Sequence, residues 1–588
     1  MIDEVDKLKG NVHIPAKDMF KRIYRYLKPE MKKFVGAMLL ILVNVALDII
    51  LPLFVSRITN NLKSDGINLR FIVGMAIAYL AIGVCNQGFL VWESMLLQKA
   101  GQNIIYTLRN EVFEHIEKLS QNQFDEMPVG SLVTRVASYT ASMSDLFTNV
   151  IVSVIRNVLT VVGVYGIMLY ISWQLSLVML AFIIVVFVTS FVFRKIVRKV
   201  FTKEREYISD LNTFLNENLS GMKLIQIFNR QAKKDDEFMQ KNENLRKSRY
   251  KVVLAFGIYR PFITLLYISS IAVTFWLGME FGLDAGMIVA FYLYLSRFFN
   301  PIQNLADQLN NLQKATTASE RLFNLLDVEP EIQNKPDAVW VDKFEGKIEF
   351  KNVWFAYKDE DWILKDVSFT INPKETCAFV GATGAGKTTI LSLIVRNYEI
   401  QKGQILIDGR DISTIEIHSL RKGIGQMLQD VFLFSGTVRS NITLNDDSFT
   451  DEEIEAACKY VNADTFIASQ EHGLDEEVIE RGENFSQGQR QLLSFSRTVL
   501  HKPQILILDE ATANIDTETE VVIQKSLENI RNIGTMLVVA HRLSTIQHAD
   551  QIIVLQNGSI IERGTHQQLI KNKGYYHKLY ELQFENKE

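Results

Sequence analysis

The chain has 588 residues, of which 48% are hydrophobic and 22% are charged, so a single compact domain does not describe it. Its formal net charge of −4 at pH 7 gives no basic excess, which argues against a nucleic-acid partner. The three cysteines, Cys85, Cys377 and Cys458, are far apart and form no CxxC pair. A disulfide framework and a thiolate zinc site are therefore both excluded.

The first part of the chain predicts an all-α membrane domain. Long apolar runs recur before residue 310, and several exceed the ~20 residues that a helix needs to cross a bilayer of ~30 Å. They cover residues 34–55, 71–97, 150–171, 175–193, 252–277 and 286–299. Core helices of a soluble protein need a polar face toward water, which these runs do not leave. We therefore predict six transmembrane helices within residues 1–325.

The positions of Lys and Arg predict the orientation of these helices. Both residue types are frequent in residues 1–33 and 194–251, whereas 172–174 and 279–285 contain neither. Because positive charge stays on the cytoplasmic side, both ends of the chain are expected there. The acidic start of the chain lacks the apolar core of a signal peptide, so we expect no cleaved leader and a bacterial cell membrane location. Residues 98–147 and 194–251 are expected to extend the helices into the cytoplasm as stalks.

The last part of the chain, after a linker at residues 326–345, predicts an α/β domain over residues 346–588. Strand-like segments alternate with helical ones, a pattern typical of a largely parallel sheet. The expected strands are residues 348–353, 376–380, 405–407, 505–508, 535–539 and 551–555.

A glycine-rich loop after the second of these strands predicts a phosphate site. Residues 381–388 fit the pattern GxxxxGK[ST], with a buried strand before and an apolar helix after it. Glycines let the backbone N–H groups face the phosphates, while Lys387 supplies a cation and Thr388 a hydroxyl for Mg²⁺. The expected phosphate-binding residues here are Gly381, Thr383, Gly384, Ala385, Gly386, Lys387, Thr388 and Thr389.

Two carboxylates, Asp509 and Glu510, follow the apolar strand 505–508, at the edge where such a sheet presents its ligands. We expect Asp509 to hold Mg²⁺, directly or through water. Glu510 is then the natural general base for the attacking water. Lys387 and Glu510 are thus expected to be catalytic.

Residues 484–493, Asn-Phe-Ser-Gln-Gly-Gln-Arg-Gln-Leu-Leu, resemble the signature motif of the ABC ATPases. The resemblance implies that Ser486, Gly488 and Gln489 clamp the nucleotide of a second chain. It also implies an adenine-stacking role for Tyr357, a Q-loop role with a Mg²⁺ contact for Gln429, a D-loop role for Asp516 and a catalytic switch role for His541.

The membrane half resembles an exporter half-transporter of the multidrug and lipid type, with coupling regions at residues 124–132 and 216–223. The resemblance implies an ATP hydrolase that exports amphipathic small molecules or drugs by alternating access. A lipid or peptide exporter, and an ATP-gated channel or regulatory protein, stay open as alternatives.

Two positions depart from the family pattern, Gln487 where the signature has glycine and Ala513 where the D-loop commonly has serine. A homodimer places Gln487 in both nucleotide sites, whereas a heterodimer confines it to one. The expected partner is therefore a second half-transporter, with a heterodimer favoured.

Ionisable residues within the apolar runs are candidates for substrate contacts, because burying charge in lipid is costly. Asn44 and Asp48 lie four residues apart on one helix face, and Arg297 lies in the last run. Pairing of Asp48 with Arg297 or Arg156 between helices is the alternative.

Overall fold

A computed structural model describes residues 12–63, 67–358, 360–428, 430–509, 517–539 and 546–584. The chain divides into two units. The first contains Met1–Glu117 and Val129–Val328, and the second contains Lys118–Pro128 and Glu329–Glu588. The short segment 118–128, which lies between two helices of the first unit in sequence, thus packs with the second unit.

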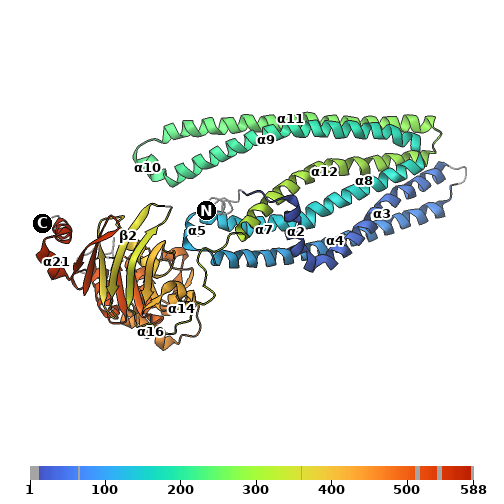
Figure 1. Ribbon diagram of the computed structural model, residues 1–588. Helices are drawn as coiled ribbons and strands as arrows, with labels where there is room; N and C mark the ends of the chain where they lie inside the picture. Colours follow the sequence, from blue (N-terminus) through green and yellow to red (C-terminus); the bar gives the residue numbers. More distant parts are fainter. Residues whose placement is uncertain are drawn as a thin grey trace. The chain divides into compact units, whose positions relative to one another are not determined.

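The first unit is all-helical (Figure 1). Its α-helices are α2 (Ala16–Leu27), α3 (Met31–Lys63), α4 (Leu69–Glu117), α6 (Val129–Thr134), α7 (Thr140–Asp145), α8 (Val152–Ile171), α9 (Trp173–Ser220), α10 (Met222–Ile227), α11 (Gln231–Glu280) and α12 (Ala285–Leu326). Two π-helical turns, Arg135–Tyr139 and Leu146–Ile151, flank α7.

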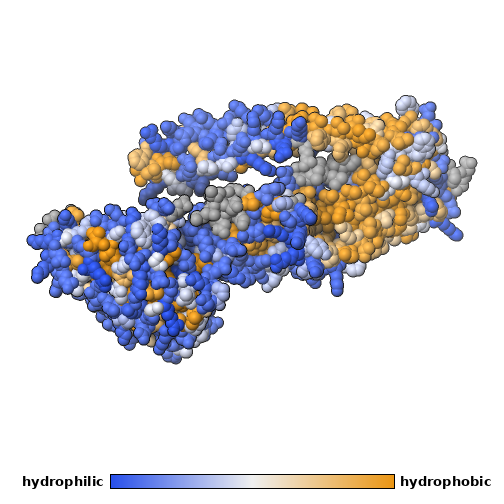
Figure 2. All heavy atoms as spheres, in the orientation of Figure 1, coloured by the Kyte–Doolittle hydropathy of each residue, from blue (hydrophilic) through white to orange (hydrophobic). Residues whose placement is uncertain are grey.

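Several of these helices are far longer than a bilayer is thick. Helix α4 has 49 residues, α9 has 48 and α11 has 50, and at 1.5 Å per residue each exceeds a ~30 Å hydrocarbon core at least twofold. Figure 2 shows the result, with hydrophobic residues gathered over one part of these helices and hydrophilic residues over the rest. The expected stalks are therefore continuous with the membrane-spanning helices.

Within the described residues, five helical segments are long and apolar enough to span a membrane. They are Lys17–Leu62, Leu69–Glu117, Val129–Ile171, Trp173–Ser220 and Gln231–Glu280. The sixth run expected from the sequence, residues 286–299, lies at the start of the 42-residue helix α12. This run is shorter than the ~20 residues that cross a bilayer, and α12 continues beyond it into a polar segment.

The helices of the first unit enclose an apolar core. Buried side chains from α8, α9, α11 and α12 meet there, among them Val164, Met179, Ile263 and Tyr294. The Tyr294 hydroxyl donates a hydrogen bond of 2.6 Å to the carbonyl oxygen of Ile49 on α3. Helices α9 and α11 run side by side and are joined through α10 (Figure 1).

The second unit contains twelve strands among the described residues. They are β1 (Ile348–Ala356), β2 (Trp362–Ile371), β3 (Thr376–Val380), β4 (Lys402–Ile407), β5 (Arg410–Asp411), β6 (Ile424–Met427), β7 (Gly436–Thr437), β8 (Glu477–Val478), β9 (Ile505–Asp509), β10 (Thr535–Val539), β11 (Gln551–Gln556) and β12 (Ser559–Gly564). The main sheet has the order β12-β11-β3-β10-β9-β6, in which only β12 is antiparallel to its neighbour.

A second sheet, with the order β2-β1-β4-β5, is antiparallel throughout. The expected strands 348–353 and 405–407 exist but belong to this sheet and not to the parallel one. Strand propensity alone does not decide this, because pairing depends on which hydrophobic faces meet.

The second unit also contains ten α-helices among the described residues. They are α5 (Gln121–Asp125), α13 (Lys387–Ile394), α14 (Ile417–Lys422), α15 (Val438–Thr443), α16 (Asp451–Tyr460), α17 (Asp464–Ala468), α18 (Gln487–Leu500), α19 (Thr517–Ile530), α21 (His566–Asn572) and α22 (Tyr575–Phe584). Successive residues of β9 alternate between two apolar cores: Leu506 and Leu508 join one, Ile505 and Ile507 the other. This period of two is the side-chain alternation of a strand buried on both faces.

Candidate nucleotide site

The glycine-rich loop 381–388 connects β3 to α13 at the carboxyl edge of the main sheet. Gly386 caps α13 with a φ of +98°, and a Cβ there would lie 2.6 Å from the Leu364 side chain. Gly384 has a φ of +81°. Both positions need glycine because L-residues with side chains rarely adopt such angles. The loop can therefore curl so that N–H groups at the start of α13 face an anion.

Lys387 is held in position by the loop itself. Its side chain is 7% exposed, and its Nζ donates hydrogen bonds to the carbonyl oxygens of Gly381 (2.9 Å) and Ala382 (3.0 Å). A buried ammonium needs such partners to offset its lost hydration. The arrangement places a cation inside the curl where phosphate charge would lie. Thr388, next in the chain, is exposed.

Asp509 ends β9, at the same edge of the sheet as the loop. Strand β10 lies between β3 and β9, and in that ladder Val539 pairs with both Phe379 and Asp509. Parallel strands present their carboxyl ends together, so the carboxylate and the loop share one edge. Hydroxyl and carboxylate oxygens are the ligands that Mg²⁺ prefers, and Thr388 and Asp509 provide them here.

Tyr357 lies just beyond the end of β1, beside the loop helix. Its hydroxyl is 3.1 Å from Oγ1 of Thr389 on α13. The ring meets those of Phe355 and Tyr398 edge to face, with centroid distances of 4.9 and 5.1 Å. The side chain is nevertheless 41% exposed, so a flat ring face is available to an aromatic base.

Four expected site residues lie outside the described residues: Gln429, Glu510, Asp516 and His541. Ala513, the departure in the D-loop, lies outside them as well.

The signature segment forms the N-terminus of α18, a helix of 14 residues. Ser486 is its N-cap: the Gln489 N–H donates to Ser486 Oγ (3.2 Å) and the Ser486 N–H donates to Gln489 Oε1 (2.9 Å). This capping box fixes the first turn. Gln487 is the first residue of the helix and is exposed, whereas Gly488 is buried. The amide side chain of Gln487 thus lies at the positive end of a helix dipole.

The loop helix and the signature helix cover opposite faces of the main sheet. Ile390 and Leu393 of α13 pack in one apolar core, and Leu492 and Phe495 of α18 pack in the other. Because the sheet separates the two helices, the Ser486 end of α18 does not complete the chain's own loop. A second copy of such a domain is needed to bring the two elements together.

The segment 118–128 is bound to the second unit by several side chains. Helix α5 has a capping box between Ser120 and Gln123. Gln123 Nε2 donates to the carbonyl oxygen of Glu329 (2.8 Å), and Asn122 Nδ2 donates to the Glu331 carboxylate (3.1 Å). The first coupling region expected from the resemblance, 124–132, thus begins inside this segment.

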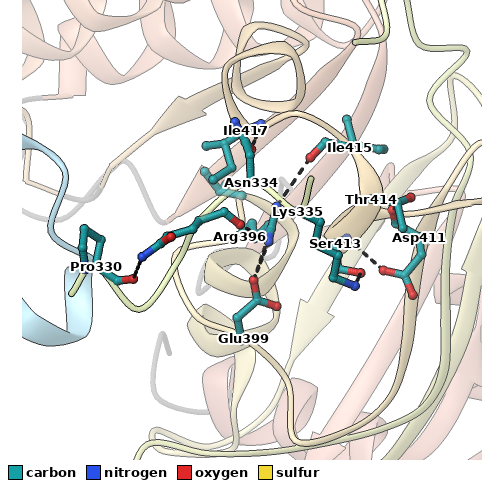
Figure 3. A network of polar contacts seen from close by, with 12 residues as sticks. Pro330, Asn334, Lys335, Arg396, Glu399, Asp411, Ser413, Thr414, Ile415 and Ile417 are labelled. Carbon is teal, nitrogen blue, oxygen red and sulfur yellow. Dashed lines mark hydrogen bonds and ion pairs between the residues drawn. The ribbon is translucent and has the colours of Figure 1, made fainter. Parts of the chain in front are cut away.

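The chain after Val328 is held by polar contacts to the same unit (Figure 3). Arg396, 2% exposed, donates to Glu399 (2.8 Å) and to the carbonyl oxygen of Gln333 (3.1 Å). Lys335 Nζ donates to Ser413 Oγ (2.8 Å). Residues 330–335 are therefore part of the α/β unit and are not a flexible linker.

Several polar residues of the membrane helices form two groups, one around Asp48 and one around Glu93. Asn86 Nδ2 donates to Asp48 Oδ1 (3.0 Å), and the nearest Arg297 nitrogen lies 3.9 Å from that oxygen. Asn44 Nδ2 donates to Glu93 (3.0 Å), and Glu93 also pairs with Arg156. Of the two partners considered for Asp48, the structure therefore pairs it with Arg297.

Sequence reasoning missed Glu93, Arg156 as its partner, and Tyr398. Glu93 stands in the polar end of an apolar run, seven residues after Asn86, so helical spacing puts both on one face. This spacing could have indicated from the sequence that Glu93 lies with Asn86 among the polar groups between the helices. Tyr398 carries no sequence signal of its own, because only the fold brings it to Tyr357.

The fold and the site together define a membrane-embedded P-loop ATPase. Residues 34–302 match the family described as "ABC transporter transmembrane region" and residues 364–513 match the family described as "ABC transporter".

Similar proteins agree with these matches. An ATP-dependent lipid A-core flippase from Syntrophus aciditrophicus is 33% identical, with 98% of this chain and 96% of that protein covered. A Bacillus subtilis protein named "Probable multidrug resistance ABC transporter ATP-binding/permease protein YheH" is 38% identical, with 84% and 74% covered. The solved structure of a bacterial Atm1-family ABC exporter with ATP bound has a TM-score of 0.77 and 25% identity, covering 94% of this chain and 98% of its own.

The chain belongs to the ABC transporter family. It is an exporter half-transporter, with a helical transmembrane domain followed by an α/β nucleotide-binding domain, as the sequence predicted. It is a multi-pass membrane protein that binds nucleotide and couples ATP hydrolysis to export. Because the half-transporter carries one of the two domains that a complete site requires, it works as a dimer.

Proposed function

We propose that this exporter moves amphipathic small molecules or drugs out of the cytoplasm or the inner leaflet by alternating access. The observation that carries the proposal is the buried Lys387 inside the phosphate loop of a chain that also spans the membrane. ATP does work here because it binds the closed arrangement of two nucleotide domains better than the open one. The name of the Bacillus subtilis relative, which refers to multidrug resistance, supports the substrate class.

In the proposed nucleotide site, Tyr357 stacks on adenine and residues 381–389 surround the phosphates. Thr388, Asp509 and Gln429 would hold Mg²⁺, which would neutralise phosphate charge when bound. Glu510 accepts a proton from the attacking water, and His541 donates to the γ-phosphate. Ser486, Gly488, Gln489 and Asp516 act on the nucleotide bound by the other subunit.

We propose that the second subunit is a different half-transporter. A homodimer would place the exposed Gln487 side chain in both sites, where a glycine is expected. A heterodimer confines it to one site and leaves Lys387 and Glu510 facing the intact signature of the partner. This assignment assumes that a side chain beside the signature N–H groups weakens their contact with the γ-phosphate.

Two exposed apolar surfaces support a partner subunit. The first lies over α10 and its flanks, where Figure 2 shows a hydrophobic patch on an otherwise hydrophilic end; its large exposed side chains are Leu219, Leu224, Ile227 and Phe228. The second contains Leu428, Phe432 and Phe434, each more than half exposed. Patches of this kind mark protein interfaces. We propose that each binds the second subunit.

We propose that the protein lies in a bacterial cell membrane with both termini and the nucleotide-binding domain in the cytoplasm. The distribution of Lys and Arg supports this orientation. In the membrane, Asn44, Asp48 and Arg297 are the proposed substrate contacts. Asp48 supports this assignment because its side chain is half exposed and its carboxylate lies as far as 3.9 Å from the nearest Arg297 nitrogen.

A lipid is the second candidate substrate, because the relative from Syntrophus aciditrophicus is a lipid A-core flippase. Substrate choice depends on the shape of the cavity in the dimer, so reconstitution has to test both classes.

The test is reconstitution of the chain alone, and together with a half-transporter encoded beside it, in liposomes with an amphipathic dye and with a labelled lipid. We expect ATP-dependent movement of the dye by the pair and little activity of the chain alone. Glu510→Gln in every competent site should abolish movement. Full dye-stimulated ATPase activity of the chain alone would overturn the heterodimer, and undiminished transport by Glu510→Gln would overturn the proposed mechanism.

A further inference from the structure

We propose that Tyr398 is a positioning residue that transmits occupancy of the adenine side of the nucleotide site to the segment 118–128. The inference rests on the proposed function, because it takes Tyr357 as the residue that stacks on the base. It adds a residue for which neither the sequence pattern nor the family matches give a role.

Tyr398 touches the segment directly. Its hydroxyl donates a hydrogen bond of 3.0 Å to Oδ2 of Asp125, the last residue of α5, across 273 positions of the chain. Burial and the Asp125 carboxylate both raise the pKa of the Tyr398 hydroxyl, so it stays protonated and remains the donor. A hydrogen bond to a charged acceptor is stronger than one between neutral groups.

Tyr398 also touches the proposed base-stacking residue. The rings of Tyr357 and Tyr398 meet at 86° with a centroid distance of 5.1 Å, and Phe355 packs against both. Tyr357 in turn places its hydroxyl 3.1 Å from Thr389 of the loop helix. A base on the exposed face of Tyr357 would restrict the ring and, through the edge-to-face contact, the ring of Tyr398.

The segment 118–128 can pass a displacement of Asp125 on to the transmembrane domain. It is joined without a break to α4 at Glu117 and to α6 at Val129, yet it packs with the nucleotide-binding unit. A shift of Asp125 is therefore passed covalently to two helices of the transmembrane domain. The neighbouring ion pair of Glu126 with Lys358 (3.3 Å) is weak by comparison, because the Lys358 side chain is 78% exposed.

The segment has a second attachment that does not involve the nucleotide site. Gln123 and Asn122 bind the backbone of Glu329 and the carboxylate of Glu331. Loss of the Tyr398 hydroxyl should therefore leave the segment docked while removing its link to Tyr357. The role of Tyr398 can thus be separated from the stability of the interface.

The test uses the full-length protein in nanodiscs and the variant Tyr398→Phe, which keeps the ring and removes only the hydroxyl. Tyr460→Phe is the matched control, since the Tyr460 hydroxyl also donates a hydrogen bond in this unit, to the carbonyl oxygen of Asn529 (2.7 Å). Hydrogen exchange of peptides covering 118–128 is measured with and without a non-hydrolysable ATP analogue and Mg²⁺. Analogue binding is measured separately.

We expect the analogue to slow exchange of residues 118–128 in the wild type and in Tyr460→Phe, on the order of 5-fold, the equivalent of one hydrogen bond. In Tyr398→Phe this nucleotide-dependent change should be lost, although the analogue still binds and the melting temperature is retained. Asp125→Asn, which keeps an acceptor oxygen, should retain the response, and Asp125→Ala should lose it. The double variant Tyr398→Phe with Asp125→Ala should lose no more of the nucleotide-dependent change in exchange than either single variant does.

A wild-type response in Tyr398→Phe, or an equal loss in Tyr460→Phe, overturns the inference. Dye movement in reconstituted vesicles is a separate readout. If the wild type moves no substrate with ATP, the proposed function fails. If it does and Tyr398→Phe keeps the wild-type number of dye molecules per ATP, only the role of Tyr398 fails.

Discussion

Arg156 on α8 donates a hydrogen bond to the carboxylate of Glu93 on α4, and Glu93 is only 1% exposed. Asn44 on α3 binds the other carboxylate oxygen. One carboxylate thus links three helices of the transmembrane domain. In a low-dielectric interior, such a charge is tolerated only with these partners.

Removing one partner of this pair should destabilise the transmembrane domain. We expect Glu93→Ala to lower the free energy of unfolding by about 3 kcal/mol, because it leaves the Arg156 charge without its partner. Thermal unfolding in detergent measures the change as a lower melting temperature. The double variant Glu93→Leu with Arg156→Leu should recover most of the loss, and equal melting temperatures for the wild type and Glu93→Ala would contradict the pairing.

The phosphate loop predicts a strong dependence of hydrolysis on Lys387. Lys387→Met should reduce ATPase turnover by roughly 10²-fold or more, because a positioned cation stabilises the charge that develops in the transition state. Lys422→Met is the control: this lysine ends α14 on the exposed surface of the same unit. Turnover by Lys387→Met close to that of Lys422→Met would rule out the assigned role.

The side chain at position 487 should limit the activity of the chain in the absence of a partner. Gln487→Gly should raise the ATPase activity of the purified chain by about 10-fold, since it opens the N–H groups at the start of α18 to the γ-phosphate. Gln489→Gly serves for comparison and should not raise it, because it breaks the capping box with Ser486. Unchanged turnover in Gln487→Gly would mean that the clamp tolerates the side chain.

Asp48 should distinguish substrates by charge. Asp48→Asn keeps an oxygen for Asn86 but removes the negative charge, so transport of cationic dyes should fall by about 10-fold while transport of neutral compounds is retained. Dye movement into inside-out vesicles measures both. An equal loss for the two classes would show that Asp48 serves only to pair with Arg297.

None of the three thiols should react rapidly in the folded, membrane-embedded protein. Cys377 and Cys458 are buried, and burial raises the pKa of the Cys377 thiol above its usual range and that of Cys458 to about 11. Both thiols therefore stay protonated and unreactive at neutral pH. Cys85 is exposed on α4 but lies within the apolar run 71–97, where it meets lipid and not water. A maleimide should therefore label none of the three sites rapidly in the membrane-embedded protein and all three after denaturation. Mass spectrometry of labelled peptides checks this, and rapid labelling of Cys377 would be inconsistent with the buried strand β3.

Much of the nucleotide site was predictable from local sequence. The strand 376–380 predicted from its apolar run is β3 residue for residue, and the helix expected after the loop is α13. Both depend on contacts between residues close in the chain, so the pattern carries the information. The largely parallel sheet was expected, but the second, antiparallel sheet that holds residues 348–353 and 405–407 was not, because their alternation is compatible with either kind of pairing.

The sequence by itself determined the class of protein, since apolar runs of membrane length and the spacing of the phosphate loop are properties of consecutive residues. Only the tertiary structure decided which polar groups meet: Glu93 with Arg156 and Tyr398 with Asp125. These contacts join residues 63 and 273 positions apart. The energy of such a contact depends on which helix and sheet faces pack together, and no local pattern encodes that choice.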